Sequence, residues 1–462
     1  MSGFLHGVEV IEAQTGTRPI KTVKSSVIGL IGTAPFADKD AFPLNKPVLV
    51  AGKRADAAGL IDPNLAAFQQ KLTERKDAAA AAVAGSEALQ LAEGKAAAAK
   101  GSDLTAQEKA EILAKLEQDA KDSIKDILDK DKGSLFAAID GIFDQAGAAI
   151  VVVRVADDAN DATVMSNMVG GVNAQGEFEG VHAFLGAESE LGFSPRILVA
   201  TGYTHQRPLD SDDNPLKNPV VAEMQGIAER LRAVIIADGP SGTNSEAIAY
   251  RSDFGSRRVF VVDPHVKVFK NGQPEEEPAS ARVAGMIAKS DNDRGFWWSP
   301  SNTAMNGIVG TQQAIDFQLG DRNARANLLN ENEVATIIRQ NGFKLWGNRT
   351  CATDPKWAFL SVVRTADMIN DSLLRAHMWA VDRNITSTYI KDVTESVQAY
   401  LDSLKAQGAI LGGQIWADED LNTPENIQAG KVYFSFDFTP PTPAEHITFK
   451  SILTNNYLEE IV

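Results

Sequence analysis

The sequence predicts an α/β core with a mostly parallel sheet, an α+β C-terminal domain and extended, strand-forming arms at both ends. Three observations support this fold class. Continuous apolar runs of strand length alternate with helical stretches through the middle of the chain, which is typical of strands buried on both faces of a parallel sheet. Two long amphipathic helical stretches follow, and both ends of the chain alternate apolar and polar residues with period two.

The core strands and the helices between them can be placed individually. We expect strands at Ala148–Val155, Arg196–Ala200, Val234–Asp238 and Arg258–Asp263. We expect helices at Ser134–Phe143, Ala222–Ala233, Glu246–Phe254 and Ala279–Ser290. Because helices and strands alternate, successive strands should run in the same direction, with helices covering both faces of the sheet. The glutamate-rich stretch Pro274–Pro278 predicts a solvated loop.

The C-terminal end, residues 431–462, predicts a strand-donating arm. Its apolar residues that alternate with polar ones, as in a half-buried strand, are Val432, Phe434, Phe436 and Phe438. The prolines that end this strand and form a candidate hinge are Pro440, Pro441 and Pro443. Ile447 and Phe449 begin a second extended piece. Such a segment would fray alone but is ordered when it pairs with a sheet edge of a neighbouring subunit.

The N-terminal end, residues 1–32, predicts a second arm. Val8 and Val10 share one face of a short strand. Residues 13–19 are turn-like and contain Gly16, a candidate hinge, and Ile20–Ile28 is extended again. Strand-bearing arms at both ends are expected where identical subunits exchange strands, so we expect a homo-oligomer.

Residues 66–132 predict a helical insertion within a core domain that we place at residues 33–340. The insertion is dominated by Ala, Lys, Glu, Asp and Gln, and its apolar residues form only a thin helical stripe. Gly85, Gly94 and Gly101 are weak points for a helix, and Ser102-Asp103 offers a helix start. We interpret the stretch as a surface helical hairpin, because a dimerising coiled coil would need more uninterrupted heptads.

The C-terminal domain, residues 341–430, contains two predicted helices. The first covers Pro355–Val381, and a second starts at Asp392, where Glu395 completes a capping box, and ends at Gly408. The charged residues that form a stripe along the first helix are Arg364, Asp367, Asp371 and Arg375. This stripe is either a solvated face or a docking face for another protein.

Composition excludes several function classes. The chain has 462 residues, and Lys plus Arg 45 against Asp plus Glu 61 gives a net charge of −16, which argues against nucleic acid or an anionic membrane as the main partner. The single cysteine, Cys351, excludes an internal disulfide. There is no signal-peptide pattern and no apolar run long enough to cross a membrane, so we expect a soluble intracellular protein without membrane insertion.

The motifs predict no catalytic, cofactor or metal site. The loop Gly239–Ser245 follows a strand and precedes a helix, but it lacks the spacing and the lysine of a phosphate loop. Ser241 and Ser245 lie near Asp238 without a Gly-x-Ser-x-Gly elbow, and the scattered histidines have no metal-ligand spacing. An α/β enzyme of the hydrolase or nucleotide-binding type is the rival class.

Several stretches also carry a resemblance to a known family. They are His6–Val10, Phe42–Val48, Val152–Val155, Pro195–Leu198, Ser301-Asn302, Phe343–Cys351, His377–Asp382 and Ala429–Lys431. Through these stretches the sequence resembles the tail sheath proteins of contractile-tailed bacteriophages, in the compact form shared with R-type contractile bacteriocins. The resemblance runs nearly from end to end but leaves out residues 66–132.

The resemblance implies a structural virion protein with no enzymatic activity and no cofactor. It implies subunits that stack as six-fold rings around a tail tube, bounded by baseplate and tail terminator proteins, and that contract to drive the tube through the host envelope. It further implies a core of subtilisin-like topology, a place in the virion tail after assembly in the bacterial host cytoplasm, and no nucleic-acid partner. The charged stripe then becomes a candidate for docking on the tube. The sheath of a secretion-type injection machine is the alternative.

Overall fold

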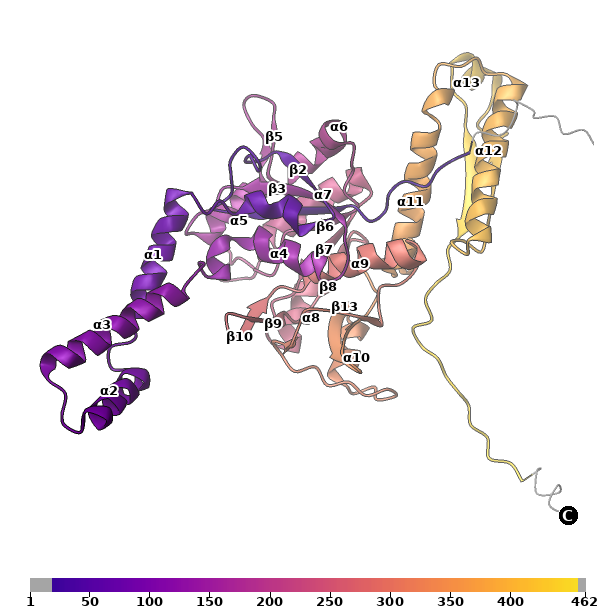
Figure 1. Ribbon diagram of the computed structural model, residues 1–462. Helices are drawn as coiled ribbons and strands as arrows, with labels where there is room; N and C mark the ends of the chain where they lie inside the picture. Colours follow the sequence, from indigo (N-terminus) through magenta and orange to yellow (C-terminus); the bar gives the residue numbers. More distant parts are fainter. Residues whose placement is uncertain (1–18, 456–462) are drawn as a thin grey trace, which may run out of the picture. The chain divides into compact units, whose positions relative to one another are not determined.

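The computed structural model describes residues 19–455, which form parts of two compact units (Figure 1). The α/β unit holds residues 22–296 and 300–371, and the C-terminal unit holds residues 297–299 and 372 onward, together with the chain up to residue 21. One helix, α11 (Leu360–Ala376), runs through the boundary between Asp371 and Ser372. Among the helices of the described residues, none is long and apolar enough to cross a membrane.

A nine-stranded sheet forms the centre of the α/β unit, in the order β11-β14-β13-β8-β7-β6-β1-β3-β2. The strands that pair in parallel are β3 (Ala149–Val155), β1 (Ile28–Thr33), β6 (Ile197–Val199), β7 (Val234–Asp238), β8 (Val259–Val262) and β13 (Val334–Arg339). The antiparallel strands toward the two edges are β2 (Pro47–Ala51), β14 (Phe343–Trp346) and β11 (Thr303–Ala304). The predicted mostly parallel sheet is therefore confirmed.

The strand β1 corrects the boundary predicted for the N-terminal arm. The sequence predicts that this arm extends to residue 32, but Ile28–Thr33 pairs with β3 on one side and with β6 on the other. All six residues of β1 are buried. The run Ile28-Gly-Leu-Ile-Gly-Thr33 is as apolar as the other core strands, but its two glycines are typical of a strand end and so hide the strand pattern in the sequence. Gly29 and Gly32 lie where a Cβ atom would be 2.8 Å from Leu198 and 2.4 Å from Ser134, so close packing requires glycine.

Helices cover both faces of this sheet, which explains its apolar strands. On one face α4 (Ser134–Phe143) and α9 (Ser280–Arg294) pack against a core that includes Ile150 and Val152. On the other face α5 (Asp161–Val169), α7 (Pro219–Leu231) and α8 (Asn244–Ser252) pack against a core that includes Val151 and Val153. Alternate residues of one strand thus enter two separate cores, as the pleat requires.

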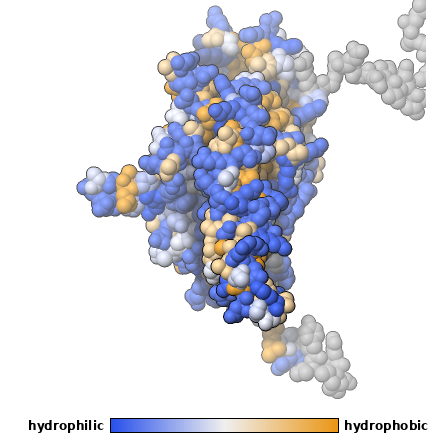
Figure 2. Space-filling view, turned by 60° about the vertical axis from the view of Figure 1, so that its left-hand side comes forward, coloured by the Kyte–Doolittle hydropathy of each residue, from blue (hydrophilic) through white to orange (hydrophobic). Residues whose placement is uncertain are grey.

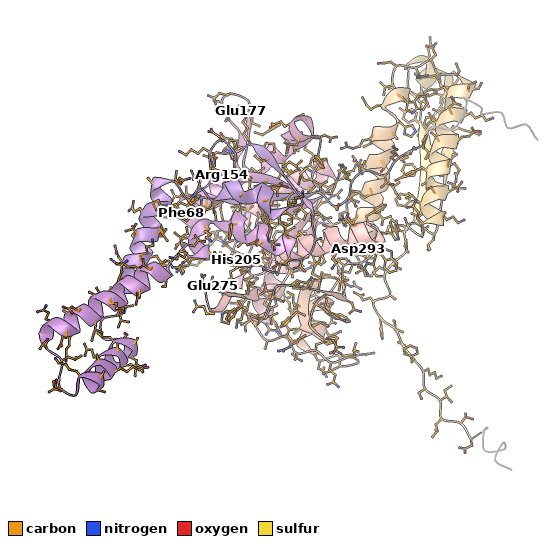
Figure 3. All side chains as sticks on the ribbon, in the orientation of Figure 1. Phe68, Arg154, Glu177, His205, Glu275 and Asp293 are labelled. Carbon is orange, nitrogen blue, oxygen red and sulfur yellow. The ribbon has the colours of Figure 1, made fainter. Side chains whose placement is uncertain are left out.

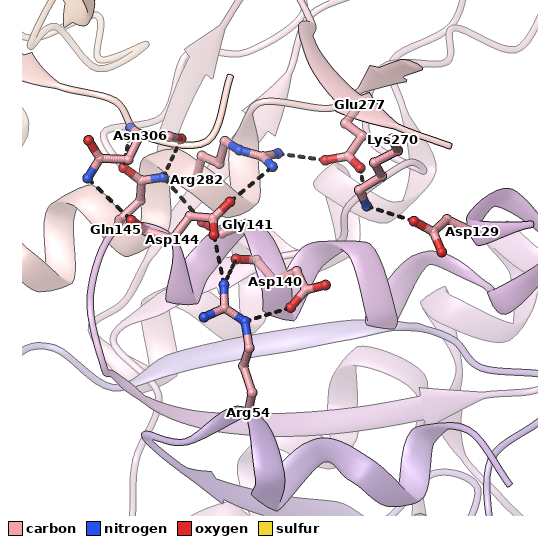
Figure 4. A network of polar contacts seen from close by, with 10 residues as sticks. All are labelled: Arg54, Asp129, Asp140, Gly141, Asp144, Gln145, Lys270, Glu277, Arg282 and Asn306. Atoms are coloured by element: carbon pink, nitrogen blue, oxygen red, sulfur yellow. Dashed lines mark hydrogen bonds and ion pairs between the residues drawn. The ribbon is translucent and has the colours of Figure 1, made fainter. Parts of the chain in front are cut away.

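The predicted loop at residues 274–278 is wrong, because most of it is a strand. β10 (Gln273–Glu277) pairs antiparallel with β9 (Val266–Lys270), which also pairs with β12 (Gly310–Thr311). Asn271 and Gly272 both have positive φ, 51° and 83°, as a tight hairpin turn demands. The Asn-Gly turn therefore determines a hairpin here despite the glutamates, which had predicted a loop. Lys270 and Arg282 each form an ion pair with the buried Glu277 at 2.7 Å and neutralise its charge (Figure 4).

A polar network connects this hairpin to α4 and to the helical turn η1 (Arg54–Leu60). Figure 4 shows Arg54 between two carboxylates. Asp140, which lies in α4, is 2.8 Å away, and Asp144, the residue after α4, is 2.7 Å away. Arg282 reaches Asp144 at 3.6 Å as well as Glu277. These contacts fix the positions of α4 and α9 on one face of the sheet.

The insertion contains three helices instead of the predicted hairpin. They are α1 (Ala66–Ala81), α2 (Glu87–Lys100) and α3 (Ala106–Ser123). Gly85 and Gly101 lie between helices with positive φ, whereas Gly94 remains inside α2. The helix start predicted at Ser102-Asp103 lies instead at Thr105, which forms a capping box with Glu108. Phe68, labelled on α1 in Figure 3, packs edge-to-face on Phe36 at 5.7 Å and anchors the insertion.

The C-terminal unit is built around α12 (Ser387–Ala406) and a two-stranded antiparallel sheet of β15 (Gly412–Ala417) and β16 (Phe434–Thr439). The helix begins before the predicted Asp392, because Thr386 caps it by accepting a hydrogen bond from the Tyr389 amide at 3.2 Å. The predicted helix over 355–381 is divided into η4 (Pro355–Trp357), α11 and η5 (Met378–Ala380).

The remaining short elements connect these parts. They are β4 (Gly171–Val172), β5 (Phe178–Glu179), α6 (Ala187–Leu191), α10 (Arg325–Glu331), α13 (Pro424–Gln428), η2 (Asp129–Lys132) and η3 (Gly180–Gly186). The face of the molecule shown in Figure 2 is mostly hydrophilic, with hydrophobic residues scattered over it, as is usual for a protein surface.

Candidate functional site

The strand predicted to be donated to a neighbour is instead paired within its own chain. β16 lies antiparallel to β15, with Phe434 opposite Ala417, Phe436 opposite Ile415 and Phe438 opposite Gly413. The rings of Phe436 and Phe438 stack at 6.0 Å. Val432 precedes the strand. The alternation therefore predicted the strand correctly, but the boundary of the arm at residue 431 is wrong, because β16 belongs to the C-terminal unit.

The unpaired part of the C-terminal arm begins after Thr439. Residues 440–455 contain no helix or strand. The apolar side chains that this segment leaves largely in solvent are Ile447 (67% exposed), Phe449 (92%), Ile452 (71%) and Leu453 (99%). Pro440, Pro441 and Pro443 separate it from β16. Burying such side chains is worth about 25 cal/mol per Å² of apolar surface, so the segment gains from a partner surface.

The sheet of β15 and β16 has open edges. Neither strand pairs with a further strand among residues 19–455. Two-stranded sheets are marginal alone, and open edges accept additional strands. Large apolar side chains at or beside the sheet are exposed, including Leu411 at 64% and Trp416 at 43%. The N-terminal candidates Val8, Val10 and Gly16 lie outside the described residues.

Most of the charged stripe of α11 is neither a solvated face nor a docking face, which corrects both alternatives predicted from the sequence. Arg364, Asp367 and Asp371 are 3%, 3% and 9% exposed. Arg364 binds Asp291 at 2.6 Å, Asp367 pairs with Arg258, and Asp371 pairs with Arg196. Three of the four side chains therefore point into the α/β unit and pair there, so they offer no surface for docking. Only Arg375 is exposed.

Burial dominates the electrostatics of Asp367. Burial raises the pKa of Asp367, while the Arg258 guanidinium opposes that shift. The partners Arg196 and Arg258 were missed from the sequence, although each stands directly before a buried strand, β6 and β8. A charged residue at the start of an apolar strand is a signal for a buried ion pair, because such residues are rarely buried without a partner.

The carboxyl edge of the sheet is where an α/β enzyme would place its active site. A cavity of about 790 Å³ lies there, lined by Thr33, Asp157 and Thr201, at or just beyond the ends of β1, β3 and β6. Nearby, the Ser241 hydroxyl accepts a hydrogen bond from the His265 backbone amide at 3.0 Å, and the His265 ring binds Glu276 at 2.9 Å. The serine hydroxyl and the imidazole thus serve structural contacts. Within residues 19–455, no group of three or more His, Cys, Asp or Glu could hold a metal ion.

Comparison with protein families and curated sequences gives consistent results. A model of the phage tail sheath protein central domain matches residues 176–351, and a model of the phage tail sheath C-terminal domain matches residues 352–454. A prophage major tail sheath protein of Pseudomonas aeruginosa strain UCBPP-PA14 is 38% identical over 462 residues, covering 99% of each chain. The tail sheath protein of Escherichia phage P2 is 32% identical, covering 100% of this chain and 98% of its own length.

Solved structures show the same fold at lower identity. The helical sheath of the anti-feeding prophage in its contracted state has a TM-score of 0.61 and 17% identity, covering 97% of this chain and 99% of that chain. The contracted sheath complex of an extracellular contractile injection system, PVC, has a TM-score of 0.59 and 15% identity, covering 99% of this chain and all of that chain.

Proposed function

Because this chain belongs to the phage tail sheath family, as a structural subunit of a contractile tail sheath and not an enzyme, we propose that it polymerises as stacked six-fold rings around a tail tube. In this proposal the polymer is held by strands exchanged between copies. It shortens on a signal from the baseplate and drives the tube through the host envelope.

The observation that carries the exchange proposal is the segment after Thr439. Four large apolar side chains, exposed by 67% to 99%, stand in a stretch without helix or strand. The prolines 440, 441 and 443 hold the chain extended, so the segment can leave its own C-terminal unit. The open edges of β15 and β16 supply the surface on which the same segment of another copy would complete its backbone hydrogen bonds.

Strand exchange also suits a polymer that changes length. Head-to-tail contacts that do not close on themselves produce helical tubes. Backbone ladders persist while the bodies that they connect rotate about hinges, here Pro440, Pro441 and Pro443, with Gly16 as the corresponding candidate at the other end. Contraction then draws on additional surface buried in the shortened array, at about 25 cal/mol per Å².

Truncation after Thr439 tests this proposal. The truncated chain keeps β16 and therefore should fold with an unchanged far-UV circular dichroism spectrum and melting temperature. It should not form tubes under conditions in which the full chain does, as seen by negative-stain electron microscopy. The variant Phe449→Asp should weaken polymerisation in the same direction, whereas Lys450→Asp, on the alternate position, should not. Tubes formed by the truncated chain would contradict the exchange of C-terminal strands.

The remaining partners follow from the same role. We place the subunit in the virion tail, assembled in the host cytoplasm, in contact with the tail tube, the baseplate and a tail terminator. Since Arg364, Asp367 and Asp371 are buried, tube contact must use other residues, and Arg375 is the one candidate of the original four that stays exposed. The α/β unit keeps the family's subtilisin-like topology in this proposal, supported by its parallel run β3-β1-β6-β7-β8.

A second candidate is the sheath of an extracellular or secretion-type injection machine, favoured by the similarity to the contracted sheaths of the anti-feeding prophage and of PVC. These likenesses, at 17% and 15% identity, concern the fold. Mass spectrometry of purified particles separates the two: a phage sheath comes with capsid proteins, and an injection machine does not.

A further inference from the structure

Three buried charges lie on one face of α11, within the part of the helix that belongs to the α/β unit. Arg364, Asp367 and Asp371 are spaced by three and four residues, which places them along one side of the helix. Burial of charged side chains is costly unless each is paired. Any movement of the helix that separates one of these side chains from its partner therefore costs free energy.

Each charge meets a different element of the α/β unit. Arg364 binds both carboxylate oxygens of Asp291 in α9 and donates to the Ser25 carbonyl at 2.9 Å. Asp367 pairs with Arg258, which precedes β8 and also reaches Glu229 of α7 at 3.1 Å. Asp371 pairs with Arg196, which precedes β6. We name these pairs, Arg364–Asp291, Asp367–Arg258 and Asp371–Arg196, the charge clamp.

The order of signs in the charge clamp specifies one register of the helix. A slide of one turn, ~5.4 Å, in one direction would place Asp367 opposite Asp291, and in the other direction would place Arg364 opposite Arg258. Both slides put like charges together in a buried site, where their repulsion is only weakly screened. Apolar ridges would allow several packings of similar energy, but this pattern allows one.

Resting on the contractile function proposed above, we propose that the charge clamp holds α11 at a single register in the α/β unit throughout contraction. The α/β unit and α11 up to Asp371 then move as one piece. Force passes along the helix into the C-terminal unit, and any bending within the subunit begins after Asp371. In this role Arg196, Arg258 and Asp291 are positioning residues for α11. Their contribution is to the specificity of one arrangement, since buried ion pairs often add little net stability.

Structures of the same wild-type sheath before and after contraction test the inference directly. In both states each pair of the charge clamp should remain within the 4 Å of an ion pair, and the register of α11 on α9 should be unchanged. A pair that opens in either state, or a shift of α11 by a turn, would overturn the inference. Failure of the proposed function gives a different result, because the wild-type chain would then form no contractile sheath.

A pair of apolar replacements tests the role of the charges. In Arg364→Met with Asp291→Leu no charge is left unpaired, so the variant should fold and polymerise. Amide hydrogen exchange over residues 364–371 of α11 should become about tenfold faster or more, and more sheaths of intermediate length should appear by electron microscopy than in the wild type.

The matched control is Lys391→Met with Glu395→Leu, which removes an exposed pair on α12 with side chains 72% and 52% exposed. It should change neither exchange in α11 nor sheath length. Unchanged exchange and sheath length in the Arg364→Met, Asp291→Leu variant would overturn the inference. If that variant does not fold, the comparison of the two wild-type states decides.

Discussion

At the scale of single residues, Asp263 shows how far burial can shift the pKa of a side chain in a structural protein. It directly follows β8 and is fully buried, and its carboxylate accepts the Ser241 amide at 2.7 Å. Burial raises the pKa of Asp263 to about 6, although the Ser241 amide and the nearby His265 act to lower it. Because the folded-state pKa lies above the unfolded value of about 3.9, Asp263 favours folding below pH ~4 and loses that contribution as the pH rises through about 6.

Asp263→Asn should therefore stabilise the protein at high pH only. At pH 8 the variant avoids a buried charge and still offers an acceptor to the Ser241 amide, so we expect a gain of up to about 3 kcal/mol in the free energy of unfolding. At pH 4 most of the gain should be lost, because the wild-type carboxyl is then protonated in the folded state and about half protonated in the unfolded state. Urea unfolding of both proteins between pH 4 and 8 measures this, and a difference that does not change with pH would contradict it.

Gly133 is a second residue whose environment permits a sharp prediction. Its φ is 84°, and a Cβ atom would lie 2.5 Å from the Thr33 carbonyl oxygen. Gly133→Ala should cost about 3 kcal/mol or more, from backbone strain and overpacking together. Gly101, with φ 71° and no atom within 4 Å of a Cβ, is the matched control, and Gly101→Ala should cost only about 1 kcal/mol. Equal losses in urea unfolding would show that the contact with Thr33 does not matter.

At the scale of elements, prediction from sequence succeeded where one local pattern decides the structure. Val234–Asp238 and Ser134–Phe143 have the predicted bounds, because a continuous apolar run and an amphipathic run between breakers specify their elements locally. The start of α12 was missed because two capping patterns compete, and Thr386 is favoured over Asp392. The strand β16 was recognised, but its partner β15, which begins Gly412-Gly413, gave no strand signal.

The site could not be predicted where distant residues decide it. From the sequence, the charged stripe of α11 looks solvated. It is buried because Asp367 and Asp371 pair with Arg258 and Arg196, which lie 109 and 175 residues away in the sequence. No spacing rule connects such positions. The exposed segment with Ile447 and Phe449, in contrast, follows from proline and from alternation alone, and it remains the predicted arm.

The insertion gives a prediction about an entire element. Phe68 is 4% exposed and contacts Phe36 at the base of α1, whereas Leu91 on α2 is 59% exposed. Phe68→Ala should cost about 3 kcal/mol or more of local stability and should make α1 sensitive to limited proteolysis. Leu91→Ala should change neither. Because α2 and α3 bury no residue fully, both variants should still polymerise, and loss of tubes in Phe68→Ala would show that the insertion takes part in assembly.

At the scale of the whole molecule, every copy carries a net charge of −16. Identical copies of such a chain repel one another, and a polymer multiplies this repulsion. In the proposed polymer, the exchange of strands and the burial of apolar side chains such as Phe449 must outweigh this repulsion, and neither of these is weakened by salt. Ionic strength therefore acts mainly on the repulsion between subunits.

Raising the salt concentration should accelerate polymerisation of the purified subunit. Between ~10 mM and ~150 mM salt the Debye length falls from about 30 to about 8 Å, so charges on neighbouring copies cease to interact at a distance and the initial rate of light scattering should rise several-fold. The chain truncated after Thr439 is the control and should not scatter at either concentration. If salt instead slows polymerisation of the full chain, attractive ion pairs between subunits, and not the apolar arm, control association. The arm would then align copies that are already held by charge.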